Sequence, residues 1–319
     1  MKPFEEKNFI ERGKLKPKAK IWAIGGGKGG VGKSFVSSSL GIFLSHFGYK
    51  TVIVDLDLGA ANLHTNFGQA PGPFGIQNLI LDNAPIEDVM TKTNFPNLKL
   101  INGYNDALDI ADINNEQKSK LLSSIYNLDA DYIILDLSAG THENTIDFFL
   151  TAQQRMLVVT PDPSSIENAY RFLKVAFFQN VKRFEQQFGL RDLINEIMSN
   201  KNQYCIRNPS DLLQVIKTKD PVNGESLHNL LKQYDHKIIL NQTHTLKERD
   251  IGNGIQSVCR KYFDVNTDFL GWVDHDNNVW QALRKRTHLL TEYPHSRIYT
   301  QLMKITKKLI DSPAYNIAA

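Results

Sequence analysis

Short apolar runs alternate with amphipathic stretches of helical length along the chain from about residue 21. Val52-Ile53-Val54 and Tyr132-Ile133-Ile134-Leu135 are apolar at consecutive positions, which is typical of strands buried on both faces. This alternation predicts a doubly wound α/β fold, with a mostly parallel sheet covered by helices on both faces. The predicted strands are Ile21–Gly26, Thr51–Asp55, Leu98–Asn102, Asp131–Asp136, Met156–Thr160, Lys237–Asn241 and Phe269–Gly271.

The stretch from about residue 190 to residue 236 interrupts this rhythm, because it holds helix-like pieces but no buried strand. It predicts a mainly helical insertion. Asn208-Pro209-Ser210 predicts a helix start capped by Asn208 or Ser210, and Asp220 to Gly224 predicts a turn. The helix-like pieces are Leu193–Met198, Asp211–Ile216 and Ser226–Gln233.

The two ends of the chain carry lysine-rich segments. Residues 1–20 predict a solvated basic arm ahead of a single domain that spans residues 21–319. Near the other end, Ile298–Ile310 sets large apolar residues against lysines. We expect that apolar face to pack on the core rather than on a membrane surface.

Composition narrows the class of protein. A formal net charge of +3 over 319 residues is too small to indicate a nucleic-acid or membrane partner by itself. Cys205 and Cys259 lie far apart, which argues against a disulfide framework or a cysteine metal site within one chain. The chain shows neither a secretory signal nor a run of about 18 apolar residues. We therefore expect a cytoplasmic protein without an integral membrane segment.

The glycine-rich string from Gly25 to Ser34, GGGKGGVGKS, follows a predicted strand and opens a helix. Glycines let successive backbone N–H groups face a phosphate, and the helix N-terminus adds positive charge there. Lys33 is then placed to reach the β- and γ-phosphates, and the Ser34 hydroxyl to ligate Mg²⁺. The predicted nucleotide-binding residues of this loop are Gly27, Lys28, Gly29, Gly30, Val31, Gly32, Lys33, Ser34 and Phe35.

Three aspartates stand at predicted strand ends. Asp55 and Asp57 are two residues apart, so their side chains point to one face. Asp136 ends another buried strand, and the carboxyl ends of parallel strands meet at one edge of a sheet. We expect the three carboxylates to lie near the bound phosphates.

The string KGGVGKS, with its additional lysine at Lys28, resembles the deviant Walker A motif of the MinD/ParA family. The resemblance extends to Val52–Leu63, which is similar to switch I, and to Tyr132–Gly140, which is similar to Walker B and switch II. Leu270–Asp276 is similar to the family's LGxIPxD segment, but the usual proline is absent. Thr160–Tyr170 resembles the FlhG-type branch, the flagellar-number ATPases. These segments span roughly Ile21 to Leu309, apart from the insertion.

The resemblance implies a homodimer that forms around ATP and Mg²⁺. It assigns catalytic roles to Lys28, which would reach the partner's phosphates, to Lys33 and to Asp57, which would orient the attacking water. It assigns the metal to Ser34, Asp55 and Asp136. Gly140 would donate its N–H toward the γ-phosphate after its loop swings, and Asn241 would recognise adenine.

The expected function is a slow ATPase switch that positions or counts a cellular structure, such as a flagellum, DNA or another polar cargo. Its activator or cargo is unknown, and residues 190–236 are a candidate surface for it. The alternatives are an amide-forming synthetase on the same scaffold, an ATP-stabilised scaffold protein, and a cluster carrier that would need a cysteine shared across a dimer.

Five cations are candidates for binding DNA, although such cations are more typical of a solvated surface: Lys182, Arg183, Arg284, Lys285 and Arg286.

Overall fold

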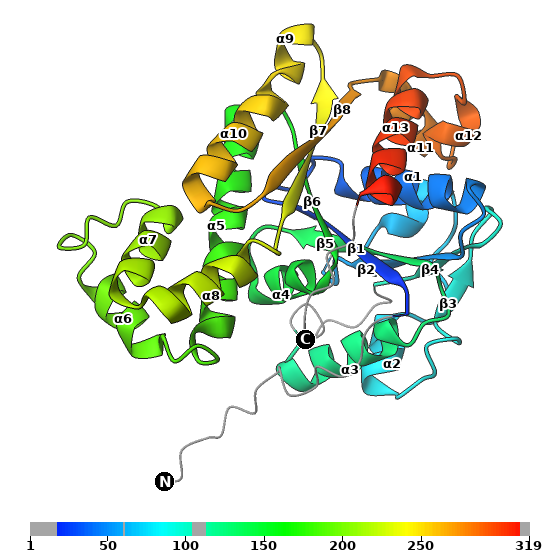
Figure 1. The fold of residues 1–319 in the computed structure, drawn as a ribbon. Coiled ribbons are helices and arrows are strands. Elements are labelled where there is room, and N and C mark those ends of the chain that lie inside the picture. Colours follow the sequence, from blue (N-terminus) through cyan, green and yellow to red (C-terminus); the bar gives the residue numbers. More distant parts are fainter. Residues whose placement is uncertain (1–17, 60, 104–112, 313–319) are drawn as a thin grey trace.

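The computed structural model describes residues 18–59, 61–103 and 113–312. Its strands are β1 (Lys20–Gly26), β2 (Thr51–Leu56), β3 (Met90–Lys92), β4 (Leu98–Ile101), β5 (Tyr132–Ala139), β6 (Gln154–Val159), β7 (His236–Thr243) and β8 (Thr267–Asp274). They form one sheet in the order β3-β4-β2-β5-β1-β6-β7-β8 (Figure 1). Of these described strands, only β3 runs antiparallel to its neighbour. The lysine-rich arm falls mostly outside the described residues, and Lys20 already belongs to β1.

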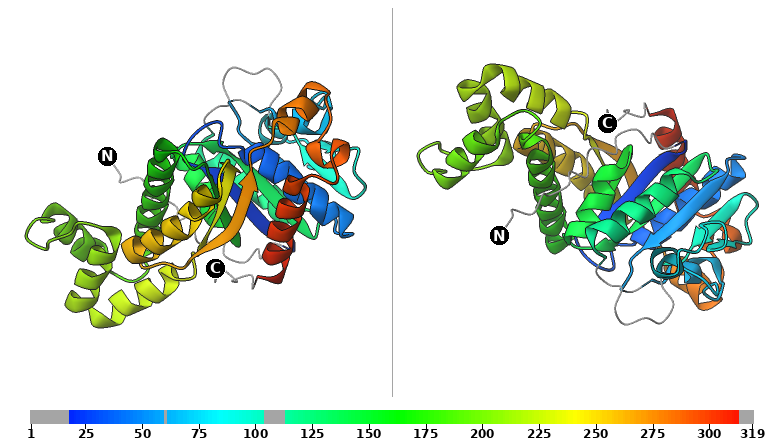
Figure 2. Two further views of the ribbon diagram at one scale, coloured as in Figure 1. Left: turned by 90° about the horizontal axis from the view of Figure 1, so that it is seen from above. Right: turned by 90° about the horizontal axis from the view of Figure 1, so that it is seen from below.

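Helices cover both faces of this sheet. Within the described residues, the helices and the 3₁₀ segment η2 are α1 (Lys33–His46), η2 (Leu63–Phe67), α2 (Ile76–Leu81), α3 (Asn115–Tyr126), α4 (Glu143–Thr151), α5 (Pro163–Glu185), α6 (Arg191–Ser199), α7 (Pro209–Lys219), α8 (Pro221–Leu231), α9 (Leu246–Arg249), α10 (Ile251–Phe263), α11 (Asn277–Arg284), α12 (Leu289–Glu292) and α13 (Arg297–Asp311). Helices α1 and α13 lie on one face, whereas α3, α4, α5 and α10 lie on the other (Figure 2).

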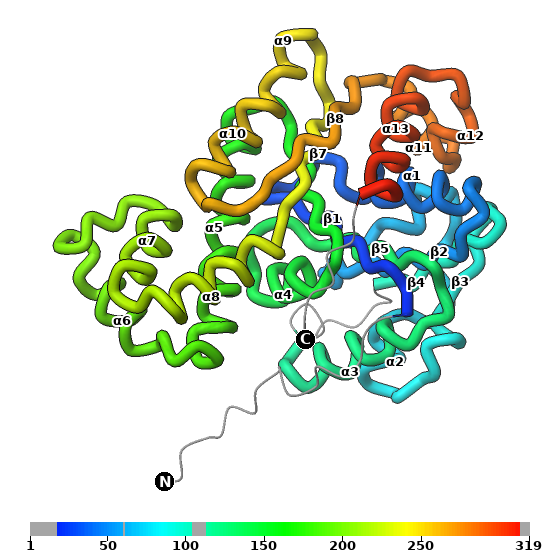
Figure 3. Tube along the Cα trace, viewed as in Figure 1, coloured from blue at the N-terminus to red at the C-terminus, as the bar shows by residue number. Residues whose placement is uncertain are grey.

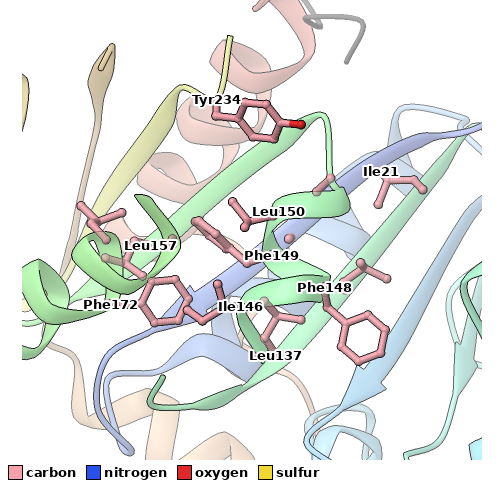
Figure 4. Packing of buried hydrophobic residues seen from close by; sticks show 14 of the residues in the cluster. Ile21, Leu137, Ile146, Phe148, Phe149, Leu150, Leu157, Phe172 and Tyr234 are labelled. Atoms are coloured by element: carbon pink, nitrogen blue, oxygen red, sulfur yellow. The ribbon is translucent and has the colours of Figure 1, made fainter. Parts of the chain in front are cut away.

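The central strands are buried on both sides because their apolar residues alternate between two cores. Ile21 and Ala23 of β1 belong to the core under α4 and α5. Trp22 and Ile24 belong to the core under α1 and α13. Figure 4 shows the first core, where the rings of Phe149 and Phe172 meet edge to face with their centroids 4.9 Å apart. The predicted doubly wound α/β fold is thus confirmed.

Every predicted strand is present, and the differences lie at the edges of the sheet. β3 was not predicted, because its three residues are at most half-buried and carry no apolar run. β8 is longer than predicted. Its register with β7 shifts beside Gly271, which has a φ of 148°. Such an irregularity interrupts the alternation of inward and outward side chains from which a strand is predicted.

The insertion is helical, as predicted, and consists of α6, α7 and α8. Figure 3 follows the chain from α5 through these helices back to β7, and Figure 2 shows them at one end of the molecule. Their buried residues, among them Ile194, Leu212 and Leu227, join the core that contains Phe177 and Phe184 of α5. The predicted cap is also confirmed, because the Asn208 side chain accepts the Asp211 N–H at 3.0 Å.

The predicted turn from Asp220 to Gly224 is wrong, since this segment starts α8. The Asp220 side chain caps the helix by accepting the Asn223 N–H at 3.0 Å, and Pro221 suits the first helical position because it has no N–H to satisfy. Gly224 lies inside the helix, where α7 and α8 meet closely. A Cβ at Gly224 would lie 2.9 Å from the Lys217 Cα, so the glycine serves packing rather than a turn.

The last helix packs as expected. Its apolar residues Ile298, Leu302, Ile305 and Leu309 are buried against α1 and β8. Across the described part of the chain, no helix combines the length and apolarity needed to cross a bilayer. Both cysteines are described and unpaired, Cys205 exposed and Cys259 buried.

His288 fastens the short helix α12 to α1. Its Nδ1 accepts the Leu290 N–H at 3.2 Å, so the neutral ring carries its proton on Nε2, which donates to the Ser38 hydroxyl at 3.1 Å. The ring also stacks on Phe35 and Phe67. Burial lowers the pKa of His288 to about 3, so the native state holds this side chain neutral.

We predict that His288→Phe will flatten the pH dependence of stability. The unfolded histidine takes up a proton as the pH falls below about 6.5, whereas the folded one does not, so wild-type stability falls by about 2 kcal/mol between pH 7.5 and pH 5 from this residue. The variant loses its hydrogen bonds, about 1–2 kcal/mol at pH 7.5. Urea titrations at both pH values measure this, and equal acid losses in both proteins would contradict it.

Candidate nucleotide and magnesium site

The glycine-rich loop connects β1 to α1, and its glycines occupy conformations that other residues rarely adopt. Gly30 and Gly32 have φ values of 79° and 92°. A Cβ at Gly27 would lie 2.2 Å from the backbone oxygen of Asn168 in α5, so only glycine fits there. Because α1 begins directly at Lys33, its free N–H groups and positive dipole end lie beside the loop.

Two side chains at the end of β7 hold the loop in place. Asn241, 4% exposed, donates from Nδ2 to the Val31 carbonyl at 2.8 Å. Gln242 donates from Nε2 to the Gly30 carbonyl at 3.2 Å. The amide predicted to recognise adenine is therefore already engaged with the loop, which leaves its second N–H and its Oδ1 for a base. Sequence reasoning missed Gln242, whose only signal was a second amide beside Asn241.

Two of the predicted carboxylates lie side by side. Asp55 and Asp136 are register partners on the adjacent strands β2 and β5, and they are 2% and 1% exposed. Asp55 accepts the N–H groups of Asp57 and Leu63, both at 3.1 Å. Asp136 accepts the Ser37 hydroxyl at 2.7 Å, a contact that the sequence did not indicate.

The pKa values of this pair show that its negative charge is poorly compensated. Burial raises the pKa of Asp55, and the neighbouring Asp136 raises it further. Burial also raises the pKa of Asp136, although hydrogen bonds from Ser34 and Ser37 and the charge of Lys33 oppose this. A bound cation would relieve this cost.

The donor set fits Mg²⁺ held together with a nucleotide. Among the described residues, no group of three or more His, Cys, Asp or Glu side chains could hold a metal alone. Mg²⁺ is commonly bound by one or two carboxylates, waters and substrate phosphates. The hydroxyl of Ser34 and the carboxylates of Asp55 and Asp136 would supply the protein's share.

Asp57 belongs to the same cluster. It is half-buried, and its charge acts on the pKa of both Asp55 and Asp136. The sequence-predicted residues Lys33, Ser34, Asp55, Asp57 and Asp136 are thus brought together at the carboxyl ends of the central strands.

Lys28 makes its contacts elsewhere, at the N-terminus of α5. Its Nζ donates to the Ser164 hydroxyl at 2.8 Å and to Asp162 Oδ1 at 3.3 Å, and its side chain is 44% exposed. Asp162 also caps α5 by accepting the Ser165 N–H at 2.9 Å. Hydrogen bonds from Ser164 and Thr160 hold the pKa of Asp162 well below its usual range, so Lys28 faces an anion.

The switch II glycine is also engaged. Gly140 has a φ of 90°, and its N–H donates to the Gly26 carbonyl at 3.1 Å. The same N–H was expected to face a γ-phosphate. The loop would therefore have to break this bond before it could make that contact.

A cavity of about 420 Å³ opens beyond Gln242, between the ends of β7 and β8. In its wall, Arg249 Nη2 donates to Oδ1 and Oδ2 of Asp274 at 2.9 and 2.8 Å. The rings of His244 and His275 stack with their centroids 4.5 Å apart. The counterpart of the LGxIPxD segment thus lines a space of base-binding size, and Asn241 does not line it. The lining residues are Thr243, His244, Arg249, Asp274, His275, Asp276, Arg297 and Ile298.

We predict that Asp136→Asn will stabilise the nucleotide-free protein while removing its response to Mg-ADP. The amide removes a buried charge, which should raise the free energy of unfolding in EDTA at pH 8 by about 1–3 kcal/mol. Mg-ADP should raise the melting temperature of the wild type but not of the variant. Asp129→Asn, at a surface carboxylate paired with Lys50, is the control and should behave like the wild type. A nucleotide-free Asp136→Asn less stable than the wild type would contradict the uncompensated pair.

Comparisons with known proteins agree with this geometry. A family model described as an AAA domain matches residues 19–190. The antiactivator FleN of Pseudomonas aeruginosa is 21% identical over 306 residues, which cover 95% of this chain and 90% of FleN. The flagellum site-determining protein YlxH of Helicobacter pylori is 30% identical over 205 residues, which cover 62% of this chain and 65% of YlxH.

A solved structure shares the fold. The septum site-determining protein MinD from Pyrococcus horikoshii, complexed with Mg-ADP, superposes with a TM-score of 0.62 at 18% identity, over 92% of this chain and 96% of MinD. The family model covers more than half of the chain and includes the glycine-rich loop and both buried carboxylates. The chain therefore belongs to the MinD/ParA family of P-loop ATPases, with FleN and YlxH among its relatives.

Proposed function

We propose that this protein is a nucleotide switch that binds ATP with Mg²⁺, dimerises around it and hydrolyses it slowly. The observation that carries the proposal is the buried pair Asp55 and Asp136, which lies beside Lys33 and Ser34 at the P-loop and whose negative charge Lys33 offsets only in part. A paired acidic site of this kind has no evident structural benefit, since an apolar pair would cost less to bury. It does suit a metal and a polyphosphate.

In this proposal, different residues of the chain bind the phosphates, the metal, the attacking water and the base. The N–H groups of the loop and of α1 hold the phosphates, and Lys33, 8% exposed, stabilises charge on the transferring group. Mg²⁺ would neutralise phosphate charge beside Ser34, Asp55 and Asp136. Asp57 is placed to orient the attacking water. The adenine would occupy the cavity between the ends of β7 and β8. Asn241 does not line that cavity, so its role would be to hold the loop through the Val31 carbonyl.

The contact of Lys28 with Asp162 and Ser164 suits a residue that acts on a partner subunit. In one chain this lysine is held by α5, so it has to leave that contact to reach a phosphate. We propose that it does so across the dimer interface, where its charge would stabilise the partner's nucleotide. Dimerisation and hydrolysis would then depend on the same side chain.

A role in positioning or counting a cellular structure is supported by the names of the relatives, an antiactivator and a flagellum site-determining protein. We extend this role to the present chain as a proposal, with residues 190–236 as the partner surface. The described surface gives DNA binding little support, because Lys285 pairs with Glu292 and Arg183 with Asp147.

We predict an ATP-dependent change in molecular mass. With Mg-ATP the wild type should shift toward a dimer, and Asp57→Ala should dimerise most completely because it binds ATP without hydrolysing it. Lys28→Ala should bind nucleotide but remain monomeric, and Lys33→Ala should lose nucleotide binding. Light scattering on a sizing column, with ADP and then with ATP, measures all four proteins.

The same measurement can refute the proposal. A mass that does not respond to nucleotide would favour a synthetase or a scaffold on this fold. A monomeric Asp57→Ala that still binds ATP would show that the water-orienting carboxylate has been assigned wrongly.

Loosening the Lys28 contact should favour the dimer. Ser164→Ala removes the shorter of the two bonds to Lys28, so we predict dimerisation with Mg-ATP at about two- to fivefold lower protein concentration, as expected for one exposed charged contact. Ser210→Ala is a matched control, because Ser210 stands at the same position of α7 and donates to its cap Asn208 at 2.7 Å, as Ser164 does to Asp162 at 2.6 Å. Equal effects of the two substitutions would contradict the Lys28 contact as a restraint.

A further inference from the structure

An open groove runs between α5 and α6, away from the nucleotide site. The two helices are joined by residues 186–190 and lie beside each other at the end of the molecule that holds the insertion (Figure 1). The groove has a volume of about 280 Å³. Four residues from each helix line it: Phe178, Val181, Lys182 and Glu185 from α5, and Arg191, Ile194, Asn195 and Met198 from α6.

The spacing of the lining residues is the same on both helices. On α5 and on α6 the four positions are i, i+3, i+4 and i+7, so each wall is one stripe of a helix surface. Seven residues of helix span about 10 Å. The groove therefore has the length of two helical turns, the size of the apolar stripe that a short amphipathic helix presents.

The floor of the groove is apolar and one end carries an ion pair. Val181 and Ile194 form the floor and are buried, and Phe178 and Met198 are half-buried at the far end. At the other end, next to the connecting residues, Arg191 pairs with Glu185 at 3.4 Å. A bound helix would thus contact apolar side chains along the groove and the Arg191–Glu185 pair at this end.

The rims of the groove carry opposite charges. Lys182 is an exposed lining residue of α5. Asp192 and Glu196 are exposed on α6 and directly follow the lining residues Arg191 and Asn195. A helix in the groove would be oriented by these rims, with acidic residues toward α5 and basic residues toward α6. The reverse arrangement would set like charges against each other on both sides.

We propose that the groove between α5 and α6 binds an amphipathic helix of a partner protein, with an apolar stripe at i, i+3, i+4 and i+7, an acidic flank along Lys182, and a basic flank along Asp192 and Glu196. A second copy of this chain fits less well, because a contact confined to a groove about 10 Å long would bury far less surface than the roughly 1,200 Å² of a stable protein–protein interface. The proposal does not rest on the ATPase assignment.

A designed peptide tests the groove directly. The probe is a synthetic 15-residue peptide with leucines at i, i+3, i+4 and i+7, glutamates on one flank and lysines on the other. About 15 residues is the length at which an isolated helix becomes marginally stable in water. The control peptide exchanges the two flanks. Methyl NMR of the full chain follows Ile194 and Met198, while Met156, buried in β6, reports that the fold is intact.

The proposal predicts saturable shifts of the Ile194 and Met198 methyl groups with the probe peptide, and about fivefold weaker binding of the flank-exchanged peptide. Lys182→Glu should weaken the probe by a similar factor and improve the control peptide. Lys232→Glu, an exposed lysine of α8 outside the groove, should change neither.

Three outcomes would overturn the proposal. The first is no shift of either methyl group with either peptide at millimolar concentration while Met156 stays in place. The second is equal binding of the two peptides, which would leave the charged rims without a role. The third is a concentration-dependent shift of the protein alone, which would assign the groove to a second copy of the chain.

Discussion

Asp55 and Asp136 occupy register-paired positions on neighbouring central strands, where almost no water reaches them. Besides burial, Asp136 raises the pKa of Asp55, Asp57 raises the pKa of both, and the charge of Lys33 lowers that of Asp136. The sheet, the covering helices and the glycine-rich loop all converge on this edge. Burying two acids here costs stability, and the proposed binding of a metal and phosphates would offset that cost. This cost is the physical reason for proposing a nucleotide and Mg²⁺ at this edge of the sheet.

The sequence predicted the centre of the molecule better than its margins. Runs such as Val52-Ile53-Val54 predict buried strands because every position is apolar. The loop glycines predict a backbone conformation that other residues rarely adopt. β3 and the outer part of β8 lacked such runs. The helix start at Asp220 looked like a turn because Asp, Pro, Asn and Gly favour both. Long-range contacts, such as Gln242 on Gly30 and Ser37 on Asp136, left no local pattern to detect.

Helix α5 links the two proposed activities. It is 23 residues long, and its N-terminal turn holds Lys28 while its last two turns form one wall of the partner groove. Its middle packs on β6 and α4 through residues such as Phe172, so the helix cannot move at one end without disturbing the core. A helix placed in this way gives a partner at α6 a physical route to the residue on which dimerisation is proposed to depend.

The most direct test of the switch is the ATPase rate of an equal mixture of Lys28→Ala and Asp57→Ala. In a mixed dimer, one site combines an intact Asp57 with Lys28 from the other subunit, whereas each parent protein lacks one of the two at every site. If Lys28 acts across the interface, the mixture should hydrolyse ATP faster than the sum of the two proteins measured separately. A rate equal to that sum would contradict a lysine supplied by the partner subunit.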